Sequence, residues 1–345
     1  MKKLKKTSLI FLILLLTLFT AACGNQEATS SNENNAIQIY TTVYPLQYFA
    51  ERIGGDAVNV ASIYPAGANE HTFEPTQKDM IALADADLFF YIGLGLEGFV
   101  ENAKKTLAGE NVKLVAAVDS VSDDQLMTSD HDDHEEVATE EDHEHGHEEV
   151  ATGEEHEEVA LEETGHEGHD HGETDPHVWI SPKISQSLAL SIKDSLVEAA
   201  PDQQEIFEKN YDALVEELQQ LDADFDEMAH AATNKTFFVS HEAFGYIANT
   251  YGLEQVAIAG LNSQDEPSQK ELTAIIDSAK EHEIEYILFE QNISSKLTEV
   301  IQQEVGAESL VLHNLGVLSQ EDIDNNETYF TLMNKNLETL KTVLN

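Results

Sequence analysis

Short apolar runs recur along this chain on both sides of a long polar stretch. They are rich in β-branched and aromatic residues, as buried strands are, and they lie at 37–43, 58–63, 88–92, 112–118, 236–240, 255–258 and 286–289. Val311 and Leu312 are a candidate for one further strand. Because segments with helical spacing separate many of these runs, the pattern predicts parallel sheets, which bind ligands beyond the carboxyl ends of their strands.

Helices are predicted where apolar residues recur at steps of three and four. This spacing occurs over 75–86, 267–282 and 323–344, and over 203–230 it predicts one long amphipathic helix without an internal Pro or Gly. A chain of 345 residues is long enough for two α/β domains.

The first residues have the composition of a secretory signal. A basic region at 2–6 precedes an apolar run at 9–19, which is too short and wrongly flanked to span a membrane stably. We therefore expect a signal peptide at 1–22. Cys23, the only cysteine, resembles the lipidated cysteine of a bacterial lipobox, with an incidental cysteine in an ordinary signal as the alternative. Residues 23–36 are then a lipid-anchor cysteine with a flexible tether, and we expect the protein outside the cytoplasm, anchored to the cell membrane.

The formal net charge of −48 narrows the classes of partner. A field of that sign repels nucleic acid and anionic lipid headgroups, and it attracts cations. We therefore expect no nucleic-acid binding.

Histidine and acid dominate residues 130–173, which contain nine histidines, twenty acids and no Lys or Arg. So polar a segment cannot bury enough apolar surface to fold, and we expect a mobile loop over about 120–174. Imidazole and carboxylate are ligands that zinc prefers, so we expect weak zinc sites; a solvated acidic linker is the alternative. The candidate loop ligands are His131, His134, His143, His145, His147, His156, His166, His169 and His171.

Three other histidines and one glutamate lie where predicted strands end or the polar loop stops. His71 follows the second strand through a short loop, and His241 and Glu290 come directly after strands. His177 is in the first segment after the loop. Together they suit a four-coordinate metal site between the two halves. Taken singly, each histidine is also compatible with a surface or core role, and Glu290 with a helix cap. The histidines without such placement are expected to be structural: His230, His282 and His313.

Five segments of the chain resemble a known family, the metal-binding lipoproteins of bacterial ABC importers (zinc/manganese solute-binding proteins of cluster A-I). The segments are TVYPL at 42–46, GANEHTFEPT at 67–76, DPHVWISP at 175–182, SHEAFGY at 240–246 and FEQNISS at 289–295. The resemblance covers nearly the whole chain. It implies two α/β lobes with parallel sheets, over 37–202 and 231–345, joined by one rigid helix at 203–230, with a metal site between the lobes.

By this resemblance the metal ligands are His71, His177, His241 and an acidic fourth residue. We favour Glu290, which reaches the site from the far lobe, over Glu70. Manganese-type relatives usually have a carboxylate where His241 stands, so three nitrogens and one oxygen favour zinc. Asp175 is a candidate hydrogen-bond acceptor that orients the ring of His177 from behind, or else a turn residue before a proline.

The resemblance implies a monomeric extracytoplasmic receptor that captures Zn²⁺ and delivers it to the permease of a zinc ABC importer. A closed site with four protein ligands leaves no position for an activated water, so we expect no enzyme. The polar loop ends a few residues before His177, which favours a role as a weak zinc collector near the site. Because neutral imidazole binds metal, affinity is expected to fall as the pH drops through about 6.5.

Three other functions are compatible with parts of the sequence: a manganese receptor of the same importer class, a surface adhesin, and a secreted zinc hydrolase. The hydrolase is disfavoured because no HExxH pair lies on a predicted helix and no Ser or Cys nucleophile motif is present.

Overall fold

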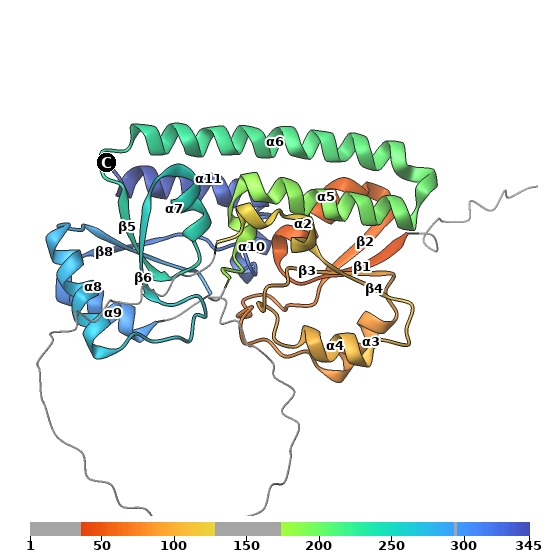
Figure 1. Cartoon of the computed structure of the whole chain (residues 1–345), viewed down its shortest axis with the longest axis horizontal. Coiled ribbons are helices and arrows are strands. Elements are labelled where there is room, and N and C mark those ends of the chain that lie inside the picture. Colours follow the sequence, from red (N-terminus) through yellow and green to blue (C-terminus); the bar gives the residue numbers. More distant parts are fainter. Residues whose placement is uncertain (1–35, 128–173, 293–294) are drawn as a thin grey trace, which may run out of the picture. The chain divides into compact units, whose positions relative to one another are not determined.

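Two four-stranded sheets organise the described residues, which are 36–127, 174–292 and 295–345 of this computed structural model (Figure 1). The first sheet contains β1 (Ile37–Thr41), β2 (Val58–Ser62), β3 (Leu88–Tyr91) and β4 (Lys113–Ala116), in the order β2-β1-β3-β4. The second contains β5 (Thr236–His241), β6 (Glu254–Ala259), β7 (Tyr286–Phe289) and β8 (Glu308–Val311), in the order β6-β5-β7-β8. All pairs are parallel. Both sheets therefore have one topology, in which the strand order reverses between the first and third strands.

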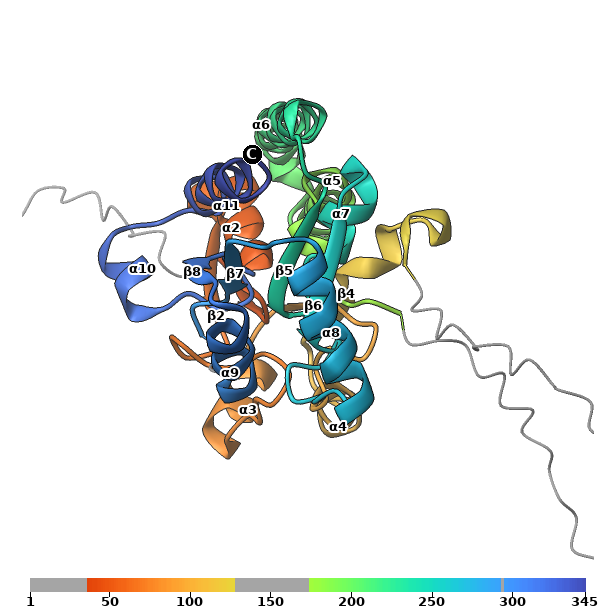
Figure 2. The same cartoon turned by 90° about the vertical axis from the view of Figure 1, so that its left-hand side faces the viewer.

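Helices lie on both sides of the two sheets. They are α2 (Tyr44–Gly54), α3 (Gln77–Ala84), α4 (Val100–Thr106), α5 (Pro182–Ala199), α6 (Gln204–Ala231), α7 (Gly245–Tyr251), α8 (Gln269–Glu281), α9 (Lys296–Val305), α10 (Gln320–Asp324) and α11 (Tyr329–Val343). Figure 1 shows α6 running past both sheets, with α2, α5, α7 and α11 between it and the strands. The view in Figure 2 shows α3, α4, α8 and α9 on the opposite side. The predicted fold class, two parallel-sheet lobes with a long helix between them in the chain, is confirmed.

The long helix α6 forms because its apolar residues share one face. That face is buried and consists of Phe207, Leu214, Leu218, Leu221, Phe225 and Met228. Polar contacts attach the same helix to both halves of the protein, the first built on the β1–β4 sheet and the second on the β5–β8 sheet. Asn210 Nδ2 donates to the carbonyl oxygen of Ile53 at 3.0 Å in the first half, and Tyr251 in the second half donates to Asp222 at 2.8 Å. The helix therefore restrains the two halves relative to each other.

The main hydrophobic core extends from one sheet to the other. It contains Ile39 of β1 and Val239 of β5, both almost fully buried. In the same core, the rings of Phe49 of α2 and Tyr329 of α11 meet edge to face, with centroids 5.1 Å apart. A second, smaller cluster lies between the second sheet and helices α8 and α9 and consists of Phe238, Ile258, Ala279, Ile287 and Ile301.

No helix in the described part of the chain is long and apolar enough to cross a membrane.

The structure differs from the predicted elements at three places. The helix predicted over 323–344 is two helices, α10 and α11, because Asn326 has a left-handed backbone (φ 55°) and Thr328 begins a new capping box. The last strand lies at Glu308–Val311, slightly before the predicted pair. The predicted loop over about 120–174 contains a 3₁₀ turn at Asp123–Gln125, after the one at Ala117–Ser120, and its residues 128–173 fall outside the described residues.

Truncating a side chain on the buried face of α6 should destabilise the fold. Leu218 is 0% exposed, so Leu218→Ala is expected to lower the free energy of unfolding by about 2–5 kcal/mol. Urea denaturation followed by circular dichroism measures this loss. Glu216→Ala, on the exposed face of the same helix, is the matched control and should change it by no more than about 0.5 kcal/mol.

Candidate metal centre

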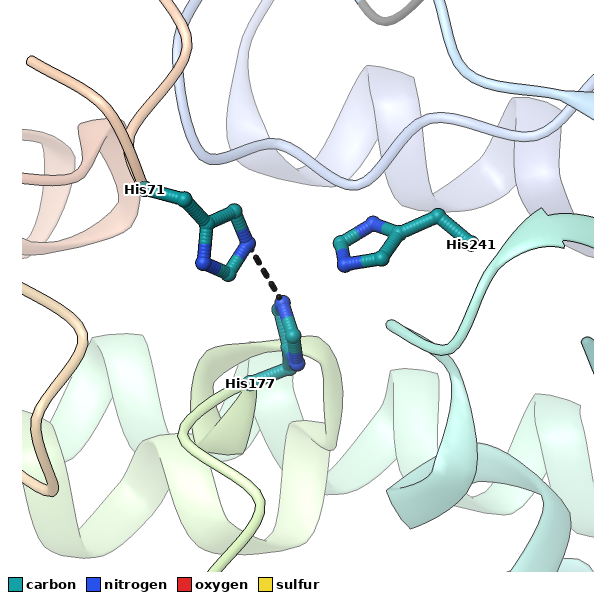
Figure 3. A group of neighbouring side chains, drawn as sticks. All are labelled: His71, His177 and His241. Carbon is teal, nitrogen blue, oxygen red and sulfur yellow. Dashed lines mark hydrogen bonds between the residues drawn. The ribbon is translucent and has the colours of Figure 1, made fainter. Parts of the chain in front are cut away.

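Three histidines that are distant in the sequence meet in the structure. His71 lies in the loop after β2, His177 in the segment before α5, and His241 is the last residue of β5. Figure 3 shows the three rings turned toward one another. One ligand atom from each lies within 4.8 Å of the others, and this is the only such group of three or more His, Cys, Asp or Glu found in the described residues.

The spacing of the three rings fits one tetrahedral metal ion. The Nε2 atoms of His71 and His177 are 3.2 Å apart. Two nitrogens bound to a tetrahedral zinc, each at about 2.0–2.1 Å, are about 3.3 Å apart. The ring centroids lie 5.2, 5.1 and 4.9 Å from one another, so the three imidazoles are nearly equidistant. His177 and His241 are fully buried and His71 is half-buried, so His71 is the most exposed of the three.

His71 is held in the form that binds metal. Burial and the two neighbouring imidazoles lower the pKa of His71 to about 2, because a charged ring there would lose its water and face other rings. The Nε2 atoms of His71 and His177 share at most one hydrogen between them, so at least one presents its lone pair.

Asp175 fixes the orientation of His177. Its Oδ1 accepts hydrogen bonds from Nδ1 of the ring and from the backbone N–H, both at 2.8 Å. Because Nδ1 donates to this buried carboxylate, Nε2 is directed at the other two histidines. This is the geometry of a carboxylate that orients a metal-binding histidine.

Both ring nitrogens of His241 lie within hydrogen-bond distance of an oxygen. Nδ1 is 2.8 Å from Oε1 of Glu290, and Nε2 is 3.0 Å from the carbonyl oxygen of Leu261. Both oxygens are acceptors, so both nitrogens donate. Burial opposes the charge, but the Glu290 carboxylate and the Leu261 carbonyl outweigh it and raise the pKa of His241 above its ordinary value. A metal ion must therefore displace a proton to bind this ring.

Neither candidate for the acidic fourth ligand belongs to the group of three nitrogens in this structure. Glu290 bonds to His241 through Oε1 and accepts a hydrogen bond from Asn314 Nδ2 through Oε2. Glu70 accepts from the same Asn314 nitrogen at 2.7 Å. Burial and the charge of Glu290 raise the pKa of Glu70 to about 7. Glu290 is thus hydrogen-bonded to one member of the group, His241, from its position directly after β7.

The strand topology explains these positions. In the second sheet the order reverses between β5 and β7, and His241 and Glu290 lie at the carboxyl ends of those two strands, where such sheets bind ligands. The equivalent point of the first sheet holds Glu97, whose carboxylate accepts from Thr42 Oγ1 at 2.7 Å and from the backbone N–H groups of Ile92 and Gly93. Burial raises the pKa of Glu97.

The remaining predicted residues are not part of this centre. His230, His282 and His313, expected to be structural, lie outside the group of three. Cys23 and the nine loop histidines fall outside the described residues. Asn314 and Trp179, whose ring is 5.3 Å from His177, were not predicted as site residues, although Asn314 follows the last strand closely and the strand-end rule applies to it.

Removing the carboxylate behind His177 should weaken metal binding. With zinc as the probe, Asp175→Ala is expected to reduce affinity by about 10–100-fold, because the ring loses its oriented tautomer. Asp175→Asn keeps an acceptor oxygen and should fall between Ala and the wild type. Competition titration against a chelator measures both, with the exposed Asp202→Ala as control. Unchanged affinity in Asp175→Ala would contradict the orienting role.

Comparison with known proteins gives consistent matches. The family described as "Zinc-uptake complex component A periplasmic" (ZnuA) matches residues 39–343. The "Zinc-binding lipoprotein AdcA" of Streptococcus pneumoniae (strain ATCC BAA-255 / R6) is 37% identical over 338 residues, which are 98% of this chain and 61% of that protein. The chain therefore spans about three-fifths of the length of this relative. The "High-affinity zinc uptake system protein ZnuA" of Bacillus subtilis (strain 168) is 36% identical, over 98% of this chain and 97% of that protein.

A solved structure supports the same assignment. The Zn(II)-bound ZnuA-like domain of Streptococcus pneumoniae AdcA superposes with a TM-score of 0.65 at 34% identity, covering 90% of this chain and 99% of that one. The resemblance inferred from the sequence is confirmed, and the chain belongs to the ZnuA family, the A components of zinc-uptake complexes.

Proposed function

We propose that this protein is an extracytoplasmic receptor that captures Zn²⁺ and passes it to the permease of an ABC importer. The observation that carries the proposal is the convergence of three imidazoles from both halves of the chain at the spacing of a tetrahedral zinc site. Relatives described as zinc-binding and zinc-uptake proteins support it. Zinc is the cargo here, bound outside the cell and released at the membrane. Three nitrogen ligands favour zinc over manganese.

Glu290 is the proposed fourth ligand. It directly follows β7, the strand that pairs with β5, and its Oε1 is already 2.8 Å from the His241 ring. When zinc replaces the proton of His241, the carboxylate needs only a short movement to reach the metal. Glu70 is less suited because its carboxylate packs against the 314–316 segment, where a Cβ on Gly316 would lie 2.5 Å from Oε1.

A receptor of this kind holds metal without catalysing a reaction. Four protein ligands fill a tetrahedral zinc, so no coordination position remains for a water that could attack a substrate. The lipid anchor at Cys23, the monomeric state and the zinc-collecting role of residues 130–173 are further parts of the proposal.

Zinc titration of histidine variants tests the function. The His71→Ala/His241→Ala double variant removes two of the three nitrogens and should lose the tight site. The His230→Ala/His282→Ala double variant is the matched control, because it removes two histidines outside the group and should bind zinc as the wild type does. A chain lacking residues 130–173 should keep the tight site and lose weaker ones. Tight binding that survives the first variant would place the function elsewhere in the chain.

Glutamate variants in the same titration identify the fourth ligand. Glu290→Gln replaces an anionic ligand by a neutral one and should weaken zinc binding more than Glu70→Gln does. The reverse order would assign the fourth position to Glu70.

The affinity for zinc should depend on pH even in the range where an ordinary histidine has already lost its proton. The raised pKa of His241 means that its proton is still bound at pH 7, and zinc must displace it. Apparent affinity should therefore rise by about tenfold per pH unit between pH 7 and 8, one proton being released for each zinc bound. Chelator competition in a series of buffers measures the slope. Glu290→Gln should flatten it, because the carboxylate that holds the proton is gone, and a flat profile in the wild type would contradict the proton exchange.

A further inference from the structure

Asn314 lies at the meeting point of several groups behind the three histidines. It follows β8, is 3% exposed and uses every polar atom of its side chain. Its Oδ1 accepts from the backbone N–H of Gly316 at 2.9 Å. Its Nδ2 donates to Oε1 of Glu70 at 2.7 Å and to Oε2 of Glu290. Two amide hydrogens thus serve two carboxylates.

Both carboxylates are buried, which makes their shared partner important. Like charges at close range in a poorly solvated place repel, and a buried acceptor without a donor is costly. A neutral amide satisfies both carboxylates at once and holds them at a fixed angle. Aspartate has no N–H to donate, and an apolar residue satisfies neither acid.

Three of the residues that Asn314 contacts each lie next to one of the three histidines. Glu290 bonds on to His241, and Glu70 is the chain neighbour of His71. The backbone carbonyl of Asn314 accepts from Nε1 of Trp179 at 2.6 Å, and that indole packs against the ring of His177.

We propose that Asn314 is a positioning residue of the zinc site. One hydrogen of its amide holds Glu290 beside His241, within reach of the metal, and the other holds Glu70 away from it. The amide therefore determines which of two adjacent acids becomes the fourth ligand. This inference rests on the proposed zinc-binding function and deepens it.

A double-mutant cycle with Glu70 separates positioning from packing. Asn314→Ala leaves two buried carboxylates without a donor between them, and zinc affinity in chelator competition should fall by about 10–100-fold. In a Glu70→Gln background only one carboxylate remains, so the same substitution should cost about fivefold or less. Equal losses in the two backgrounds would show that Asn314 only packs, and no loss in either would overturn the inference.

A second variant and a second readout protect the test from misfolding. Asn314→Ser retains one donor for one carboxylate, and its zinc affinity should lie between Ala and the wild type. Visible absorption of the Co²⁺-loaded protein should also lose intensity in Asn314→Ala, as more than one water takes the place of the carboxylate and the coordination number rises above four. An unchanged spectrum would count against positioning. If the wild type itself lacks tight zinc binding, or keeps it after loss of His71 and His241, the proposed function fails first.

Discussion

Parallel strands leave their carboxyl ends at one edge of a sheet, and in this chain two such edges contribute to a single group of side chains. His241 and Glu290 extend directly from neighbouring strands of the second sheet, so backbone hydrogen bonding fixes their separation. His71 comes from the first sheet through a loop, and His177 from the segment before α5. The geometry of the site therefore depends on the relative placement of the two sheets, which α6 restrains through bonds to both.

Buried charge is the second condition that shapes this region. A charged group taken out of water is tolerated when a partner of opposite charge or a donor replaces the lost hydration. Glu290 has the imidazolium of His241 on one oxygen and the amide of Asn314 on the other. Glu70 also accepts from that amide, but its burial and the charge of Glu290 outweigh this bond and raise its pKa. A divalent ion entering here replaces a proton by a larger positive charge, which suits a place that already contains two acids.

The fold and much of the site follow from local sequence signals. Apolar runs located seven strands to within one or two residues, and because side chains at strand ends share an edge, His241 and Glu290 could be placed together. Helix α5 was absent from the predicted elements because its buried face includes Ser185, Ser191 and Ser195, which weaken the apolar periodicity. Strand β8 carries mostly exposed residues, so its end and the importance of Asn314 were obscured. The raised pKa of His241 comes mainly from Glu290 and in smaller part from the carbonyl of Leu261, a contact that no spacing in the sequence encodes.

The two sheets share one topology but are unequal as places for ligands. At the reversal point of the first sheet, Glu97 bonds to the hydroxyl of Thr42 and to two backbone N–H groups, the donors that an anionic ligand would otherwise use. At the reversal point of the first sheet, the donors are thus already occupied by a carboxylate of the chain itself, Glu97. The half built on the first sheet therefore contributes its two imidazoles, His71 and His177, from segments outside its strands, while the second half contributes His241 and Glu290 directly at its strand ends.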